Sequence, residues 1–131
     1  MYDNTEYPSA RKMLQVQAIR ARRKACRCLI ALPHEVFVDL DDGPIQNLAI
    51  LRKHRPITRI TSWPSTTPGH SHVVVSLNVS LPATELLALM GMLGSDPKHI
   101  AFAWKYLQKY GQLYSILFQP LGAEPLDRSM S

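Results

Sequence analysis

Three aspartates, at positions 39, 41 and 42, lie at the end of a short and largely apolar stretch, Val36-Phe37-Val38-Asp39-Leu40-Asp41-Asp42-Gly43. Valine, phenylalanine and leucine favour a strand, in which side chains two positions apart point to the same face. Asp39 and Asp41 therefore share one face, where their charges repel unless a cation lies between them. Oxygen ligands of this kind suit Mg²⁺ or Mn²⁺. The pattern predicts a divalent metal site, and a polar turn that caps the next helix is the alternative.

A hydroxyl-rich loop that leads into an apolar run is the second chemical feature. Serine and threonine hydroxyls, together with exposed backbone N–H groups, can hold phosphate oxygens. Two histidines share one face at the start of the following run, and each can donate to a phosphate or bind a metal. A purely structural hydrogen bond is the alternative for either ring. The predicted nucleotide contacts are Ser65, Thr66, Thr67, Gly69, His70 and His72.

The basic residues are unevenly distributed along a chain whose formal net charge is +5. Lysine and arginine are frequent between Tyr7 and His34, where no acidic residue occurs, and acids are absent again from Gly43 to Thr84. A one-sided basic surface is expected for a polyanion partner such as DNA or RNA. A basic surface that only keeps the protein soluble is the alternative. The predicted nucleic-acid contacts are Arg20, Arg22, Arg23, Lys24, Arg52, Lys53 and Arg55.

Length and composition indicate one folded domain. The chain has 131 residues, of which 46% are hydrophobic, enough for a buried core. No apolar run approaches the ~20 residues that span a bilayer, and Met1 to Glu6 lacks a secretory hydrophobic region. We therefore expect no membrane association and a cytoplasmic location, which is the host cytoplasm if the protein is viral. Cys26 and Cys28 are too close for an ordinary disulfide and are expected to pack.

Hydrophobic periodicity and turn residues predict the elements that position these groups. Ser9 begins a basic helical stretch that contains no Gly or Pro from Ala10 to Leu29. The later elements are expected as a strand at 35–41, a helix at 43–54, strands at 57–63 and 71–79, a helical region after Pro82, a helix at 97–110 capped by Asp96, and a strand at 113–119.

The order after the first helix is thus strand, helix, strand, strand, helix, strand. A βαββαβ series predicts an α+β fold, with a ferredoxin-like (RRM-like) antiparallel sheet and helices on one face. The expected division is an N-terminal basic helix at 1–34, the α+β core at 35–119 and a flexible tail at 120–131. In such a sheet Asp39, Asp41 and His72 would lie on the face away from the helices, open to solvent.

The two chemical stretches together resemble a known family. Val38-Asp39-Leu40-Asp41, followed by Ser65-Thr66-Thr67-Pro68-Gly69-His70-Ser71-His72-Val73, is similar to the first two motifs of archaeo-eukaryotic-type primases (primase-polymerases). Those motifs are a strand-borne Asp-x-Asp and a small-residue loop that ends in a histidine before an apolar strand. Residues 93–97 and 114–118 resemble small phage and provirus proteins with that core, so the resemblance covers about 36–118.

The resemblance implies a DNA replication protein of a phage or mobile element that performs metal-dependent nucleotidyl transfer. Its partners would be nucleotides, a single-stranded DNA or RNA template and other replication proteins. Asp39 and Asp41 would bind the catalytic Mg²⁺ or Mn²⁺, and His72 would contact the nucleotide phosphate. The family pattern has a further acidic residue on a late strand, whereas residues 113–119 carry none. Asp96 is the nearest candidate for that third ligand.

Two other functions remain open. His70-Ser71-His72 and Tyr106-Leu107-Gln108-Lys109 resemble the metal site and nucleophile of rolling-circle (HUH-type) nicking endonucleases, although the middle residue of that histidine pair is normally apolar. A non-catalytic nucleic-acid-binding replication accessory protein is the third hypothesis. In such a protein, the bases of the bound nucleic acid would stack on Trp63, Tyr110 and Tyr114. Trp104 is expected in the core.

Overall fold

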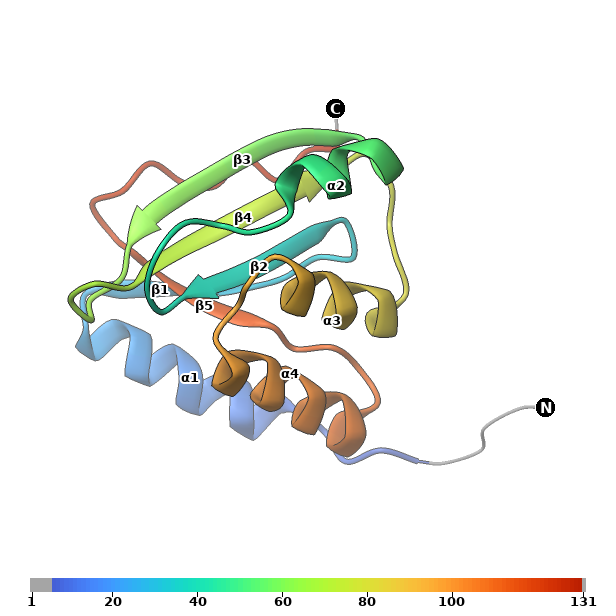
Figure 1. Ribbon diagram of the computed structural model, residues 1–131. Helices are drawn as coiled ribbons and strands as arrows, with labels where there is room; N and C mark the ends of the chain where they lie inside the picture. The colour runs from blue at the N-terminus through green and yellow to red at the C-terminus, as the bar shows by residue number, and fades with distance from the viewer. Residues whose placement is uncertain (1–5, 131) are drawn as a thin grey trace.

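The strands form two antiparallel sheets rather than one. In the computed structural model, which describes residues 6–130, β2 (Glu35–Leu40), β4 (Ser71–Leu77) and β3 (Ile57–Pro64) form a sheet in the order β2-β4-β3 (Figure 1). A separate two-stranded ribbon joins β1 (Cys26–Ile30) to β5 (Ile116–Pro120). The polar start before residue 6 and the last residue of the predicted tail lie outside the described range.

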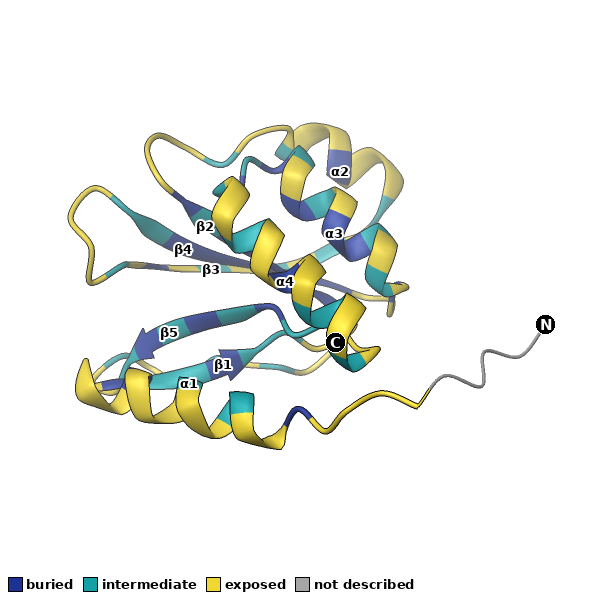
Figure 2. Cartoon of the chain, turned by 90° about the horizontal axis from the view of Figure 1, so that it is seen from below, coloured by how far each residue is buried: buried dark blue, intermediate teal, exposed yellow. Residues whose placement is uncertain are grey.

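Helices and sheets alternate in layers. Figure 2 shows α2 (Leu48–His54) and α3 (Ala83–Met92) on one side of the three-stranded sheet and the β1–β5 ribbon on the other. Helix α1 (Arg11–Arg23) lies against the outer side of the ribbon, and α4 (Pro97–Tyr110) runs alongside both sheets. No helix in this part of the chain is long and apolar enough to cross a bilayer.

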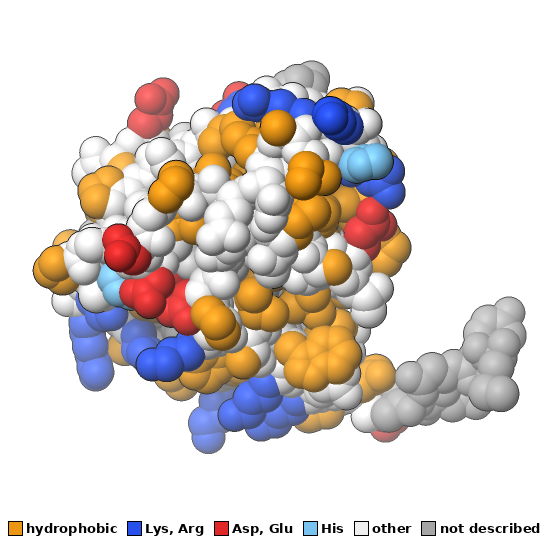
Figure 3. All heavy atoms as spheres, in the orientation of Figure 1, with side chains coloured by type: hydrophobic (Ala, Val, Ile, Leu, Met, Phe, Trp, Pro, Cys, Tyr) orange, Lys and Arg blue, Asp and Glu red, His pale blue; other side chains and the backbone are white. Residues whose placement is uncertain are grey.

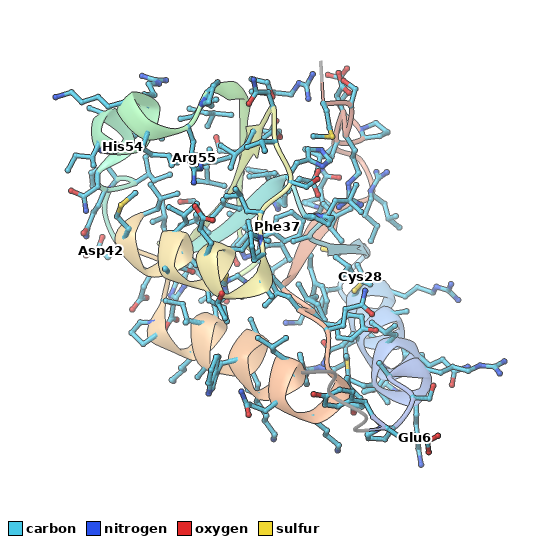
Figure 4. All side chains as sticks on the ribbon, turned by 90° about the vertical axis from the view of Figure 1, so that its right-hand side faces the viewer. Glu6, Cys28, Phe37, Asp42, His54 and Arg55 are labelled. Atoms are coloured by element: carbon cyan, nitrogen blue, oxygen red, sulfur yellow. The ribbon has the colours of Figure 1, made fainter. Side chains whose placement is uncertain are left out.

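Both faces of the three-stranded sheet are buried. Val36, Val38 and Val75 face the helices and pack with Leu86 and Met90, as their alternation along the strands predicts. The opposite face carries Phe37 and Val74, which pack with Leu29, Trp63 and Leu117 under the ribbon. Phe37 accordingly lies at the centre of the molecule (Figure 4). Burial of each such side chain contributes about 1.5–3 kcal/mol, which explains why the ribbon covers this face.

The α+β class is confirmed, but the ferredoxin-like strand order is not. In that order the last strand would extend the sheet beside β2; here β5 pairs with β1 instead. The expectation of an open sheet face at Asp39 and His72 is wrong except at one end, because the ribbon covers the rest. The long helical stretch expected up to Leu29 is also wrong. Helix α1 ends at Arg23, Ala25 turns the chain with a φ of 55°, and β1 follows.

Residues 121–130, predicted as part of a flexible tail, make specific contacts. The Arg128 guanidinium donates to both carboxylate oxygens of Glu35, whose side chain is fully buried, and to the Ile30 carbonyl. Arg59 pairs with Asp127, with 3.1 Å between Nη2 and Oδ2. These contacts tie the end of the chain to β1, β2 and β3.

Candidate functional site

Two aspartate–histidine pairs lie at one end of the β2–β4 strand pair, one within the strands and one just beyond them. The antiparallel register pairs Asp39 with His72, and Oδ1 of the aspartate lies 3.6 Å from Nε2 of the histidine. The same register continues past the strand ends to Asp41 and His70, whose Oδ1 and Nε2 atoms are 2.8 Å apart. The structure therefore brings together both aspartates and both histidines that the sequence analysis selected. Their surroundings differ, because the Asp41 side chain is 67% exposed and that of Asp39 only 25%.

The β5 backbone fixes the orientation of the inner histidine. The Phe118 carbonyl lies 3.1 Å from Nδ1 of His72 and also accepts the indole N–H of Trp63 at 2.9 Å. A carbonyl only accepts, so Nδ1 of His72 carries the proton and Nε2 of the neutral ring presents a lone pair. That lone pair faces Asp39 Oδ1, which is buried and makes no hydrogen bond. Two hydrogen-bond acceptors, Asp39 Oδ1 and His72 Nε2, thus lie opposite each other at the end of the sheet.

A third histidine, His99 of α4, is connected to Asp39 through Ser95. The Ser95 hydroxyl oxygen accepts the Asp39 backbone N–H at 3.0 Å and lies 3.0 Å from Nδ1 of His99. Nε2 of His99 lies 3.1 Å from the Ile116 carbonyl and therefore carries the proton. The hydroxyl proton of Ser95 is then directed to Nδ1. This chain of hydrogen bonds links the end of β2 to α4 and β5.

Burial keeps both imidazoles neutral. It lowers the pKa of His72 below its ordinary value of 6.5, and the charge of His70 acts in the same direction, whereas Asp39 and the Phe118 carbonyl oppose it. Burial also lowers the pKa of His99, again against the effect of Asp39. At pH 7 the site therefore holds two neutral rings of fixed tautomer beside one carboxylate.

A pocket of about 270 Å³ opens over Asp39, His72 and His99. Its size is close to the lower end of the ~300–1,000 Å³ range of small-molecule sites. Basic side chains border it from the end of α1, hydroxyl groups from the β3–β4 turn and aromatic rings from α4. Those bordering residues are Arg20 and Lys24, Ser65, Thr66 and Thr67, and Phe102 and Tyr106.

The predicted phosphate loop reaches the pocket with only part of its length. Ser65, Thr66 and Thr67 line it, whereas Gly69 and His70 do not. The loop closes on itself, since the Ser65 N–H donates to the His70 carbonyl at 3.0 Å and the His70 N–H to the Thr67 carbonyl at 3.1 Å. Gly69 has a φ of +83°, which the turn requires and a side chain would disfavour.

Asp96 does not join Asp39 and Asp41 as a third carboxylate. Its Oδ1 accepts the Lys98 N–H at 2.9 Å, so the side chain caps α4. Its backbone N–H donates to the Asp39 carbonyl at 2.6 Å, which holds the helix start against β2. Within residues 6–130, no group of three or more His, Cys, Asp and Glu side chains is arranged to hold a metal ion.

The predicted basic contacts fall into two separate groups. Arg20 and Lys24 border the pocket, and Arg22 and Arg23 lie nearby, exposed on α1. The other group, on and after α2, lies on the far side of the sheets (Figure 1). Figure 3 shows Lys and Arg side chains gathered separately over α2 and around α1. His54 and Arg55 lie at the opposite end of the molecule from Glu6, which precedes α1 (Figure 4). Only the α1 group adjoins the candidate site.

Several residues of the site were not predicted, and two aromatic assignments were wrong. Ser95, which lies just before the α4 cap, and His99, in the first turn of α4, were not predicted as part of the site. Trp63 is 7% exposed and packs edge-on against His72, so its indole is not free to stack on a base. Trp104, expected in the core, is 49% exposed.

Comparison of the chain with protein-family models, with curated proteins and with solved structures finds no match. Function must therefore be argued from the chemistry of the pocket.

Proposed function

We propose that this protein catalyses divalent-metal-dependent nucleotidyl transfer on nucleic acid, the activity implied by its resemblance to primase-polymerases. The supporting observation is the pair of acceptors on the pocket floor. Asp39 Oδ1 is buried without a hydrogen bond, and the lone pair on Nε2 of His72 faces it at 3.6 Å. A buried, unpaired carboxylate oxygen is costly, and a cation between the two atoms would remove that cost.

The donor set, one carboxylate oxygen and one imidazole nitrogen, suits Mn²⁺ better than Mg²⁺, which prefers oxygen ligands. Asp39 and His72 would hold the ion, and water and substrate phosphates would supply the remaining ligands. When bound, the ion would lower the pKa of an attacking hydroxyl and offset phosphate charge. Asp41, which pairs with His70 just beyond the strand ends, is a second carboxylate close to the site.

The rest of the pocket suits a nucleotide. Arg20 and Lys24 provide positive charge for a triphosphate, and the Ser65–Thr67 turn provides hydroxyl donors. Phe102 and Tyr106 offer ring faces for a base. In the transfer, the oxygen of a terminal 3′-hydroxyl forms a bond to the α-phosphorus of the nucleotide. The bond from that phosphorus to pyrophosphate breaks, and the hydroxyl proton passes to solvent.

One observation favours a second candidate, the nicking reaction. Tyr106 lines the same pocket as Asp39 and His72, within reach of the same substrate volume. In that reaction the Tyr106 oxygen would form a bond to a backbone phosphorus, and the bond to the 3′-oxygen would break to leave a 3′-hydroxyl. The mechanism requires the phenol oxygen, whereas nucleotidyl transfer uses Tyr106 only as a ring.

The test is a paired assay on single-stranded DNA with Mn²⁺, scoring primer synthesis and covalent protein–DNA adducts for each variant. Nucleotidyl transfer predicts that Asp39→Asn abolishes primer synthesis and that Tyr106→Phe retains it. Nicking predicts an adduct that Tyr106→Phe abolishes. Asp42→Asn is the matched control, because this neighbouring carboxylate is exposed and does not line the pocket. DNA binding that persists in a chelator, with neither product formed, would leave only the accessory-protein hypothesis.

A further inference from the structure

A ladder of aromatic rings runs along α4 beside the pocket, which Phe102, Tyr106 and Tyr114 line. Phe102, Tyr106 and Tyr110 recur every four residues, with ring centroids 6.4 Å and 6.0 Å apart. The Phe102 and Tyr106 rings are stacked, with 28° between their planes, and the Tyr106 and Tyr110 rings are tilted by 40°. Tyr114, just beyond the helix, continues the series at 6.1 Å from Tyr110. Phe102, which lines the pocket, is 55% exposed, so much of this residue is accessible to a partner.

Positive charge lies directly beside this ladder. Lys98, Lys105 and Lys109 recur along α4 at helical spacing next to the rings, and no acidic residue occurs from Pro97 to Ala123. The Lys109 ammonium lies 5.4 Å from the centroid of the Tyr110 ring. One helix therefore presents a row of lysines and a row of aromatic rings side by side, a combination that complements a flexible polyanion with flat bases.

Helix α1 borders the other side of the surface that carries the aromatic ladder. Gln17 and Arg20 border the pocket together with Phe102 and Tyr106 of α4. At the other end of the helix pair, the ring of Tyr7, just before α1, lies against Gly111 at the end of α4. Helix α1 carries no acidic residue. The two helices thus flank one surface that is basic on both sides, aromatic along α4 and continuous with the pocket above Asp39.

A lipid bilayer is a poorer partner for this surface than nucleic acid. Membrane-surface helices present a broad apolar stripe to the lipid, whereas α1 exposes only Val16 and Ile19 among its large apolar side chains. Tyr106 and Tyr110 are half-buried and in contact with each other, so they offer ring faces and edges rather than a protruding apolar wedge.

We infer that the surface between α1 and α4 binds single-stranded nucleic acid without sequence preference, with about three bases against the α4 rings and the phosphates along the lysines and Arg20. The inference rests on the proposed function only in one respect, namely that the bound strand leads to Asp39.

The test is fluorescence anisotropy of a labelled oligo-dT strand with the full chain in a chelator, so that binding does not depend on a metal. Phe102→Ala and Tyr110→Ala should each weaken binding about 5- to 150-fold, the effect of losing one stacked base. Trp104→Ala is the matched control, an exposed aromatic residue of the same helix outside the ladder, and should leave the affinity unchanged. Unchanged far-UV circular dichroism would confirm that each variant folds.

Salt dependence tests the electrostatic half of the inference. Four phosphate contacts predict a slope of log affinity against log salt of about −3, and Lys105→Ala with Lys109→Ala should reduce its magnitude by about 1.4.

Equal weakening by Trp104→Ala, no effect of the ladder variants, or tighter binding to phosphatidylserine vesicles than to oligo-dT would each overturn the inference. Asp39→Asn separates the two proposals, because it should retain oligo-dT affinity while primer synthesis is lost. Ladder-dependent binding without catalysis in the wild type would refute the proposed function alone.

Discussion

Asp39 and His72 face each other across neighbouring antiparallel strands, with 3.6 Å between Oδ1 and Nε2 and no hydrogen bond to that oxygen. His72 cannot turn its protonated nitrogen towards Asp39 without losing the Phe118 carbonyl. The protein therefore maintains a repulsive pair that a cation would stabilise.

The first prediction exploits this repulsion. In Asp39→Asn the amide can donate to Nε2 of His72, which replaces two opposed acceptors with a hydrogen bond worth about 1 kcal/mol. We expect the free energy of unfolding without metal to stay the same or rise, while Mn²⁺ binding at this pair is lost. Urea unfolding and Mn²⁺ electron paramagnetic resonance titration measure the two effects. A loss of several kcal/mol on substitution would show that the carboxylate stabilises the metal-free fold.

The second prediction concerns pH. Because the pKa values of His72 and His99 are lowered in the folded protein, the unfolded chain takes up protons that the native state does not, starting near 6.5. The free energy of unfolding should therefore fall as pH decreases from 6.5 towards the lowered native values, and should be insensitive to these rings above that window. Urea midpoints on either side of pH 6.5 measure the slope.

His99→Gln identifies the contribution of one ring to that slope. The glutamine amide can still donate to the Ile116 carbonyl but does not titrate in this range. We expect a shallower fall in stability below pH 6.5 for this variant than for the wild type. An unchanged slope would mean that His99 is not shielded from protonation in the folded state.

The expected βαββαβ order placed the strands of Asp39 and His72 near each other, and strand alternation put both side chains on the face away from the helices; the structure pairs the two residues. The same reasoning could not reveal β1. Helix α1 ends without the Gly or Pro that usually marks a helix end; instead Ala25 adopts a positive φ, and Cys26–Ile30 becomes a strand through pairing with β5, about 90 residues later in the chain. Strand pairing over that separation leaves no local signal.

The missed half of the site has a similar cause. His99 lies on a helix whose apolar residues suggested only packing, and it becomes part of the site because β5 supplies the Ile116 carbonyl and Ser95 supplies a hydroxyl. Trp104 was assigned to the core from its helical spacing with Ile100 and Leu107. Tertiary structure turned α4 so that Ala103 is buried and Trp104 is exposed. Periodicity indicates that a helix has an inner face but fixes its rotation only approximately.

A third prediction tests the link between β2 and α4. Ser95→Ala removes the acceptor of the Asp39 N–H and the donor to His99, which leaves polar groups unsatisfied in a site that is largely buried. The expected cost is about 1–3 kcal/mol of unfolding free energy. Ser115→Ala is the matched control, since its hydroxyl has only long contacts, 3.5 Å to His99 and 3.9 Å to the Met90 sulfur. Equal costs for the two variants would argue against the hydrogen-bond chain through Ser95.

The last prediction concerns the end of the chain. Glu35 is fully buried, and its carboxylate accepts from the Leu32 N–H at 2.9 Å and from Arg128. Arg128→Ala would leave that charge without its cation, at a cost of about 3–5 kcal/mol. Arg55→Ala breaks the partly exposed pair with Glu85 and should cost less than about 1 kcal/mol. Urea unfolding of both variants compares a buried ion pair with an exposed one in the same protein. If Arg128→Ala cost no more than Arg55→Ala, the last residues would not contribute to the stability of the fold, and their contacts with β1 and β2 would be incidental.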